Sequence, residues 1–422
     1  MSSAARLRAT AKTMTEFLRR PAAGIPPVLS SAAEFLAAAN RIAGGHGPIA
    51  IDTERASAFR YDDRAFLIQI KRAGAGTFLF APEGRRAELG AALAPVINNL
   101  TWVVHAAVSD LPCLAWLGLY PARLVDTELG GRLAGLSRVG LGAMYEDLLG
   151  VRVAKEHSAQ NWSSTPLPKS WLAYAALDVE ELLELADEVE YLLRSQEKWE
   201  WALEEFEYVR TQHQDIVAPD AREWHEVKGI RGLACPRELA IAREIWTIRE
   251  DIAARDDISP GKILSNKVIL AIASRRPANL AQLKRVPGAK NSRLAPSTWL
   301  DAIRRAENLP VSELPVPGEG ELAHWRNSQG INTRLWKKRD ADSWNTWELV
   351  REDLRELSDE IAVPHENLVN ATSAKKITWD LTVTHSIRTE DDLEDALAAE
   401  DLREWQKDII WPVFAELLPE DH

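Results

Sequence analysis

Apolar residues follow two different spacings in the first part of the chain. They recur at helical spacing over residues 31–43, and two glycines then end that pattern. Residues 48–54 form a short apolar run that ends in acids, which predicts a buried strand. Two more strand-like runs occupy 66–70 and 77–80, and the glycine-containing segment 73–76 between them indicates a hairpin. We therefore expect one helix followed by an antiparallel meander of three strands.

The next segments alternate between helical and strand patterns. A helix is predicted at 85–98, a strand at 102–105, a helix near 109–117 and a strand at 124–125. A meander followed by alternating helices and strands is typical of a mixed sheet with helices on its faces. After an irregular stretch, a continuous apolar stripe predicts one long helix from about residue 170 to residue 195.

The rest of the chain shows mainly helical periodicity. Ile248–Ile252 resembles Val350–Leu354, and so do the segments that follow each. A degenerate tandem repeat of one small helical domain is therefore predicted, with chance similarity as the alternative. Prolines and glycines mark a linker between the two copies. The predicted division of the chain is a flexible leader (1–27), an α/β domain (28–200), a connector (201–234), a helical domain (235–308), a linker (309–321) and a second helical domain (322–422).

The 422-residue chain has a formal net charge of −12, but this charge is unevenly distributed. Residues 222–308 contain seventeen Lys and Arg against ten Asp and Glu, whereas residues 309–422 contain twelve against twenty-five. A basic module beside an acidic region suits an enzyme with a polyanionic substrate. Two distant cysteines, Cys113 and Cys235, fit a reducing cytoplasmic setting, and no apolar run is long enough to span a membrane. The Arg-, Ser- and Ala-rich leader is predicted to be flexible, with a transit peptide as the alternative.

Two carboxylates end the first predicted strand. Side chains alternate along a strand, so Asp52 and Glu54 are expected on one face and Thr53 on the other. Neighbouring carboxylates repel each other unless a raised pKa, a basic partner or a divalent cation offsets the repulsion. Hard cations such as Mg²⁺ take such oxygen ligands. The alternative is a strand end with two solvated acids.

Two further acids occupy positions that suit the same chemistry. Asp110 follows a buried strand, although it could instead cap a helix. Asp178 and Tyr174 lie four residues apart on the predicted long helix, so they share one helix face. Each has an ordinary structural interpretation by itself. The four acids together, in this order, indicate a metal site.

The combined motifs resemble the ribonuclease D family, within the DEDD superfamily of 3′–5′ exonucleases, in the branch where a tyrosine accompanies the last acid. This resemblance implies a ribonuclease H-like α/β exonuclease domain, with a mixed sheet flanked by helices, followed by two all-α HRDC-like domains. Residues 235–308 resemble the HRDC domain, an auxiliary nucleic-acid-binding module, and the last block resembles a diverged second copy. The motifs are Asp52–Glu54 with Leu67–Ile70, His105–Leu111 with Leu124–Thr127, and Tyr174–Val179.

The resemblance and the chemistry of phosphodiester hydrolysis give the same assignment. Two divalent ions, Mg²⁺ or Mn²⁺, can activate water and stabilise the leaving alkoxide. Tyr174 is expected to orient the attacking water through its phenol. The predicted ligands of these ions are Asp52, Glu54, Asp110 and Asp178.

Three other residues receive more open predictions. His105 is expected to contact substrate or to be a buried structural histidine, and Asp126 is expected to cap a helix. Trp162, in the irregular segment before the long helix, is the best candidate for stacking on a base, although most of the chain's tryptophans are expected in the core.

The predicted function is a metal-dependent 3′–5′ exoribonuclease that releases nucleoside 5′-monophosphates from RNA with a free 3′ end. The resemblance implies tRNA 3′ processing, a cytoplasmic location and a monomer. A DNA 3′–5′ exonuclease and a non-catalytic RNA-binding adaptor are the alternatives. The complete set of acids argues against the adaptor, whereas no residue distinguishes RNA from DNA.

Overall fold

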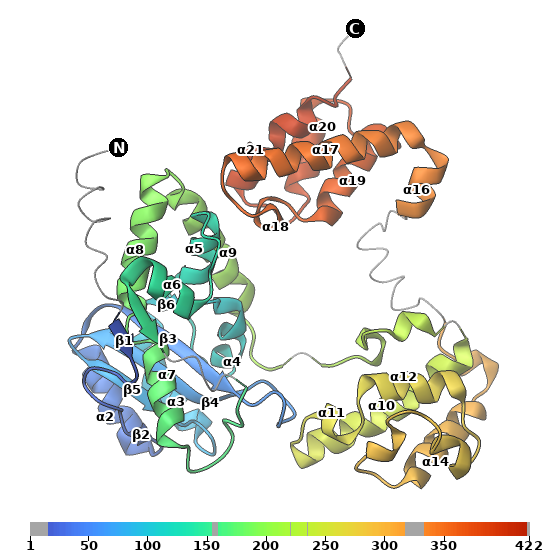
Figure 1. Ribbon diagram of the computed structural model, residues 1–422, viewed down its shortest axis with the longest axis horizontal. Coiled ribbons are helices and arrows are strands. Elements are labelled where there is room, and N and C mark those ends of the chain that lie inside the picture. The colour runs from blue at the N-terminus through green and yellow to red at the C-terminus, as the bar shows by residue number, and fades with distance from the viewer. Residues whose placement is uncertain (1–15, 154–158, 220, 234, 317–332, 420–422) are drawn as a thin grey trace.

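A computed structural model describes most of the chain as one α/β unit and two helical units (Figure 1). Residues 1–15 of the predicted leader and residues 317–321 of the predicted linker lie outside the described part. No described helix combines the length and the apolar character needed to cross a membrane. The described residues are 16–153, 159–219, 221–233, 235–316 and 333–419.

A six-stranded sheet forms the centre of the α/β unit. Its strands are β2 (Val28–Leu29), β3 (His46–Arg55), β4 (Ala65–Ala73), β5 (Gly76–Phe80), β6 (Thr101–Val104) and β7 (Arg123–Asp126). They lie in the order β2-β5-β4-β3-β6-β7. The pairs β3–β4 and β4–β5 are antiparallel, which confirms the predicted meander. The remaining pairs are parallel, so the sheet is mixed, as predicted.

Helices cover both faces of this sheet. On one face Phe35 of the first helix packs on Phe80, with ring centroids 6.1 Å apart. Ser31 caps that helix by accepting a hydrogen bond from the Glu34 amide, so the helix starts close to the predicted position. The helices are α2 (Ala32–Ala43), α3 (Arg86–Ile97), α4 (Leu111–Ala115), α5 (Thr127–Leu133), α6 (Leu141–Met144), α7 (Lys169–Asp178), α8 (Leu182–Ser195) and α9 (Trp199–His213), with the helical turns η1 (Ala107–Ser109) and η2 (Tyr145–Leu149).

The single long helix predicted from residue 170 to residue 195 is wrong. The structure has two helices, α7 and α8, which are separated at residues 179–181. At the break the Tyr145 hydroxyl donates to the carbonyl oxygen of Asp178, an acceptor that a continuous helix would have used internally. The apolar stripe continues through both helices, so the periodicity alone could not reveal this break.

Part of the predicted leader is ordered. Residues Glu16–Leu18 form β1, which pairs in parallel with β8 (Val151–Val153) in a separate two-stranded sheet. The helix α9 begins just before the predicted connector and extends into it, and it packs against β7 and α5. The predicted domain boundaries themselves remain predictions.

The first helical unit has its own core, with Trp299 fully buried in it. Asp257 of this unit accepts hydrogen bonds from Arg60 and Arg64 of the α/β unit, and the Lys262 ammonium lies 3.8 Å from the centre of the Phe59 ring. Its elements are η3 (Trp224–Glu226), η4 (Ile230–Gly232), α10 (Pro236–Asp256), α11 (Pro260–Ile263), α12 (Asn266–Arg275), α13 (Leu280–Leu283), η5 (Ala289–Asn291), α14 (Pro296–Glu307) and η6 (Val311–Glu313).

The second helical unit repeats the order of a long helix, a one-turn helix and a third helix. This order agrees with the predicted tandem repeat. Its core is continuous with that of the α/β unit, because Trp405 stacks on Trp201 of α9 at 5.0 Å between centroids. Its helices are α16 (Thr333–Arg339), α17 (Ala341–Glu360), α18 (His365–Leu368), α19 (Ala371–Thr382), α20 (Glu390–Ala398) and α21 (Glu404–Ala415).

Candidate active site

The end of β3 supplies two of the predicted site acids. In the β3–β4 ladder Asp52 pairs with Gln69 and Glu54 pairs with Leu67, so these four side chains share one face of the sheet. Thr53 lies on the opposite face, as the alternation predicts. Glu54 is buried, whereas Asp52 is partly exposed.

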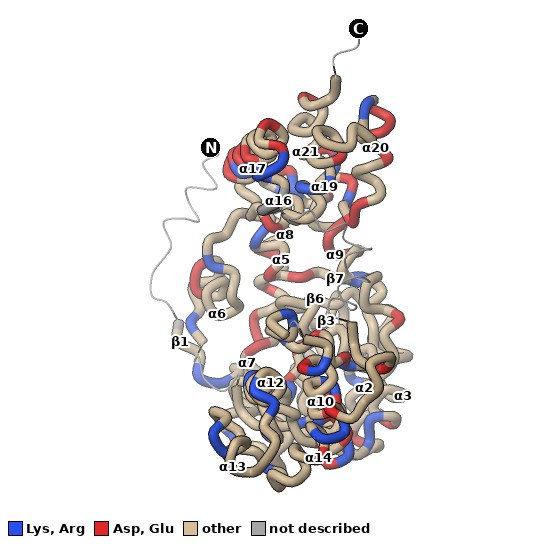
Figure 2. The backbone as a smooth tube through the Cα atoms, turned by 90° about the vertical axis from the view of Figure 1, so that its right-hand side faces the viewer, with Lys and Arg blue, Asp and Glu red and all other residues tan. Residues whose placement is uncertain are grey.

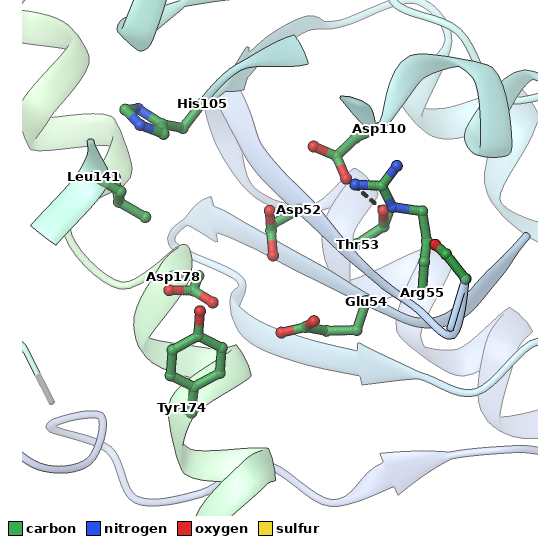
Figure 3. Close-up of a pocket in the computed structure, with 10 residues that line it drawn as sticks. Asp52, Thr53, Glu54, Arg55, His105, Asp110, Leu141, Tyr174 and Asp178 are labelled. Carbon is green, nitrogen blue, oxygen red and sulfur yellow. Dashed lines mark hydrogen bonds between the residues drawn. The ribbon is translucent and has the colours of Figure 1, made fainter. Parts of the chain in front are cut away.

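The helix α7 covers the face of the sheet that carries these acids. Leu67 and Leu79 pack with Ala175, Ala176 and Trp162 in a small apolar cluster. This packing fixes the helix over the strand ends. Because the side chains at positions 174 and 178 lie one helical turn apart, Tyr174 and Asp178 both face the end of β3 (Figure 3).

Asp110 lies in the segment that follows β6, directly after the helical turn η1. The turn passes through Ala106 with a φ of 60°, and the backbone amides of Ala106 and Ala107 donate to the Asp126 carboxylate. Asp126 also accepts from the first amides of α5, so its predicted role as a helix cap is confirmed. Asp110 makes no side-chain cap, and instead its carboxylate accepts a hydrogen bond from the Thr53 hydroxyl.

A cavity of about 320 Å³ opens between these elements. Figure 3 shows Asp52 and Glu54 near its centre, Tyr174 with Asp178 on one side, and Asp110 with Arg55 on the other. Carboxylate oxygens of Asp52, Glu54 and Asp178 all lie within 4.8 Å of one another. Asp110 lines the same cavity outside that group of three. The lining residues are Asp52, Thr53, Glu54, Arg55, Ser57, His105, Asp110, Leu141, Tyr174 and Asp178.

The electrostatics of this cavity favour a bound cation. Burial, followed by repulsion from Asp52, raises the pKa of Glu54 to about 11. Burial raises the pKa of Asp178 to about 8 and that of Asp110 to about 6, although Tyr174 and Thr53 respectively oppose these shifts through hydrogen bonds. Carboxylates that repel one another at the bottom of a polar cavity are suitable ligands for a hard divalent cation. The residues therefore fit the metal site that the sequence predicts.

His105 and Trp162 differ in their access to the cavity. His105 lines it, with its Nδ1 atom 2.9 Å from the Thr127 hydroxyl, and burial lowers its pKa to about 4. Trp162 is only 1% exposed and packs against Trp171 and Tyr174, so the prediction that it stacks on a base is wrong. Its indole supports the ring of Tyr174 from within the core.

Nothing in the sequence singles out Thr53 and Arg55 as site residues. Thr53 was expected to point away from the acids, and it does so, but this direction brings it to Asp110 on the other wall. Arg55 follows directly after the acid pair, and no sequence pattern distinguishes it from other surface arginines. Only the arrangement of strands and turns reveals both positions.

Comparisons with known proteins agree with this geometry. Residues 27–194 match the family model described as "3'-5' exonuclease", 238–295 match the HRDC domain, and 331–418 match a "3' to 5' exonuclease C-terminal domain". The curated ribonuclease D of Acidiphilium cryptum (strain JF-5) is 29% identical over 305 residues, which cover 70% of this chain and 76% of that protein.

Two solved structures extend the likeness to nearly the whole chain. A protein from Bifidobacterium adolescentis is 31% identical with a TM-score of 0.82, and the match covers 96% of this chain and 99% of that one. Escherichia coli RNase D, described as an exoribonuclease involved in structured RNA processing, is 21% identical with a TM-score of 0.65, over 93% of this chain and 98% of that one. The second likeness shows a shared fold.

The exonuclease fold, the cluster of acids with its tyrosine, and the HRDC domain define a DEDD-type 3′–5′ exonuclease, a class that depends on divalent metal ions. Within this class, the named relatives and the shared arrangement of domains are those of ribonuclease D. By these likenesses the chain is a 3′–5′ exoribonuclease that is similar to ribonuclease D.

Proposed function

We propose that this protein removes nucleoside 5′-monophosphates one at a time from RNA with a free 3′ end, using two divalent ions, Mg²⁺ or Mn²⁺. The observation that carries the proposal is the convergence of the Asp52, Glu54 and Asp178 carboxylates within 4.8 Å, under a cavity that Tyr174 borders. Divalent ions bound there would activate water at neutral pH and neutralise the charge of the phosphoryl group.

Each site residue then has a distinct proposed task. Asp52, Glu54 and Asp178 hold one ion, and Asp110 on the other wall joins Asp52 at the second. Tyr174, which shares a hydrogen bond with Asp178, orients the attacking water through its phenol. His105 contacts the nucleotide from the rim of the cavity.

The first helical unit supplies a surface for the RNA backbone. Its Lys and Arg residues gather around α12 and α13, whereas acidic residues are prominent on α17 (Figure 2). Lys267 lines a cleft of about 390 Å³ beside the turn at Gly288, and Lys262 lies at the contact with the α/β unit. Arginines elsewhere in the unit form ion pairs, for example Arg276 with Glu307. Basic groups around such a cleft can neutralise phosphates without reading the sequence.

The biological setting of this activity is also a proposal. We infer that the substrates are tRNA precursors and other small structured RNAs, because the relative from Escherichia coli is described as processing structured RNA. We propose that the protein acts in the cytoplasm as a monomer, and its unpaired Cys113 and Cys235 suit a reducing compartment.

One experiment tests the polymer, the direction and the metal together. The protein is incubated with RNA and DNA oligomers labelled at the 5′ or the 3′ end, with Mg²⁺, with Mn²⁺ or with EDTA. We expect a ladder of shortened 5′-labelled RNA, immediate release of the 3′ label, and no cleavage in EDTA. Preferential cleavage of DNA would favour a DNA exonuclease, and cleavage in EDTA would contradict the metal assignment.

Replacing Tyr174 by Phe should lower kcat by about 100-fold, because the attacking water would lose the hydrogen bond that positions it. The ring would keep its contact with Trp162, so the fold and the RNA affinity should change little. Single-turnover cleavage and anisotropy of a labelled RNA measure the two effects. Tyr191→Phe on α8 is the matched control, because Tyr191 is 55% exposed. An unchanged kcat for Tyr174→Phe would remove the tyrosine from the proposed chemistry.

Stability in EDTA should fall as the pH rises from about 4 to about 8. The pKa values of Asp110 and Asp178 are raised to about 6 and about 8, and the unfolded chain titrates near 3.8. A carboxyl group whose pKa is raised in the folded state contributes stability that is complete below its unfolded pKa. This contribution is lost as the pH rises through its folded pKa. Saturating Mg²⁺ should reverse this trend, because deprotonated ligands bind the ion. Melting temperatures measured with and without the ion check both slopes, and Asp178→Asn should flatten them.

A further inference from the structure

Arg55 is the last residue of β3 and lines the cavity. Alternation along the strand directs its side chain away from Glu54 and to the side of Thr53, where Asp110 lies. Figure 3 shows the guanidinium beside Asp110, on the opposite side of the cavity from Tyr174.

Arg55 is the only Lys or Arg among the described residues that line this cavity. Its partly exposed side chain makes no hydrogen bond or ion pair within the described part of the chain. Arg60 and Arg64, which follow closely, are both held by Asp257. The N–H groups of the Arg55 guanidinium, which lies beside four carboxylates, are therefore available to bind an anion in the cavity.

The chemistry of the cavity indicates which anion this is. A guanidinium offers planar pairs of N–H donors that match two oxygens of a phosphate, and it remains charged at every physiological pH. A chain end bound between Tyr174 and Arg55 would present its non-bridging phosphate oxygens to the guanidinium, while the attacking water approaches from the tyrosine side.

We propose that Arg55 binds the phosphate of the 3′-terminal nucleotide, both in the substrate and in the released 5′-monophosphate. This inference rests on the proposed function and adds a substrate-binding residue outside the set of acids. Arg55 also serves as a resident counter-charge for the carboxylates. Burial raises the pKa of Asp110, and the nearby guanidinium acts in the opposite direction.

Because Arg55 has both tasks, its removal should affect the binding of a nucleotide phosphate and of a divalent cation in opposite directions. Without the guanidinium, the phosphate loses a charge-assisted contact, so a nucleotide should bind more weakly. The carboxylates lose a competing positive charge, so a divalent cation should bind more tightly. A merely structural arginine would not separate the two affinities in this way.

The test uses the full chain with Arg55→Ala and Arg55→Lys. Calorimetry measures the binding of adenosine 5′-monophosphate and of adenosine in Mg²⁺, and electron paramagnetic resonance measures Mn²⁺ binding without nucleotide. For Arg55→Ala we expect about 10-fold weaker binding of the monophosphate, unchanged binding of adenosine, and about 3-fold tighter binding of Mn²⁺. Arg55→Lys should recover part of the monophosphate affinity, because an ammonium keeps the charge without the planar fork.

Arg123→Ala is the matched control, because Arg123 is exposed at the start of β7 and does not line the cavity. It should leave all three affinities unchanged. Equal monophosphate affinity in Arg55→Ala and wild type would overturn the inference, and so would weaker Mn²⁺ binding. If Arg55→Ala fails to fold, Arg55→Gln and the lysine variant carry the same comparison.

The RNA cleavage assay separates this inference from the function on which it rests. If wild-type protein shortens RNA while Arg55→Ala binds the monophosphate normally, only the role of Arg55 is wrong. If wild-type protein does not shorten RNA in Mg²⁺ or Mn²⁺, the proposed function and the phosphate site are both wrong.

Discussion

Asp52→Asn should abolish RNA cleavage, with a loss of about 1,000-fold or more. Asp52 lies in the group of three carboxylates and also between the two walls of the cavity, so its removal affects both proposed ions. Each tenfold loss in rate corresponds to about 1.4 kcal/mol of transition-state stabilisation, and a metal ion contributes several kcal/mol. Quantified release of nucleoside 5′-monophosphate from a labelled RNA measures this loss.

The same variant should be more stable than wild type in EDTA at pH 8. Burial raises the pKa of Asp52 well above its ordinary value, with further contributions from Asp110 and Asp178, so the folded protein is strained by this charge. An asparagine removes that repulsion. Wild type should gain stability from Mg²⁺, and the variant should gain little.

Asp63→Asn is the control for both measurements, because Asp63 is exposed in the loop between β3 and β4. It should match wild type in activity and in melting temperature. Cleavage by Asp52→Asn at the wild-type rate would contradict the metal site. Loss of activity together with a lower melting temperature would indicate damage to the fold instead.

Trp405→Ala should destabilise the protein by about 3–5 kcal/mol, the range measured for removing a large buried aromatic side chain. Trp405 is 2% exposed, stacks on Trp201, and donates from its indole nitrogen to Glu205 at 3.0 Å. The same contact joins the core of the second helical unit to that of the α/β unit. We therefore expect the second helical unit to detach at lower denaturant concentration, in a separate unfolding step.

Trp405→Phe provides the graded comparison. It keeps an aromatic ring against Trp201 but loses part of the buried ring volume and the hydrogen bond to Glu205, which Arg403 still contacts at 2.7 Å. A loss of about 1 kcal/mol is expected from that bond. Urea unfolding followed by tryptophan fluorescence, together with limited proteolysis, measures both variants. Unfolding curves of Trp405→Ala that match wild type would contradict the shared core.

The elements that the sequence predicted well are those whose signal is local. The meander of β3, β4 and β5 follows from apolar runs and a glycine turn, and the helix α2 follows from apolar residues at helical spacing. The break between α7 and α8 was missed because the apolar stripe continues across it. The interruption depends on the contact between Tyr145 and the backbone of Asp178, which lie 33 residues apart.

The candidate site shows the same division. The types and order of the acids made the cluster of carboxylates predictable, because few chemistries need four carboxylates and a tyrosine in such contexts. Trp162 was misjudged because an irregular segment gives no periodicity from which burial can be read, and in the fold it lies in the small core beneath α7. Arg55 was not selected because only the fold brings Asp110, from a distant segment, to the side of β3 on which Arg55 lies.

By itself the sequence determined which chemistry this protein carries, because residue types and local spacing set the charge, the donor atoms and the strand and helix faces. The tertiary structure decided which of those groups lie close together. It brings three carboxylates of the site within 4.8 Å of one another, places Asp110 beside Thr53 and Arg55 across the cavity from Tyr174, and packs the second helical unit against α9. These meetings depend on packing between segments far apart in the chain, and no local pattern encodes them.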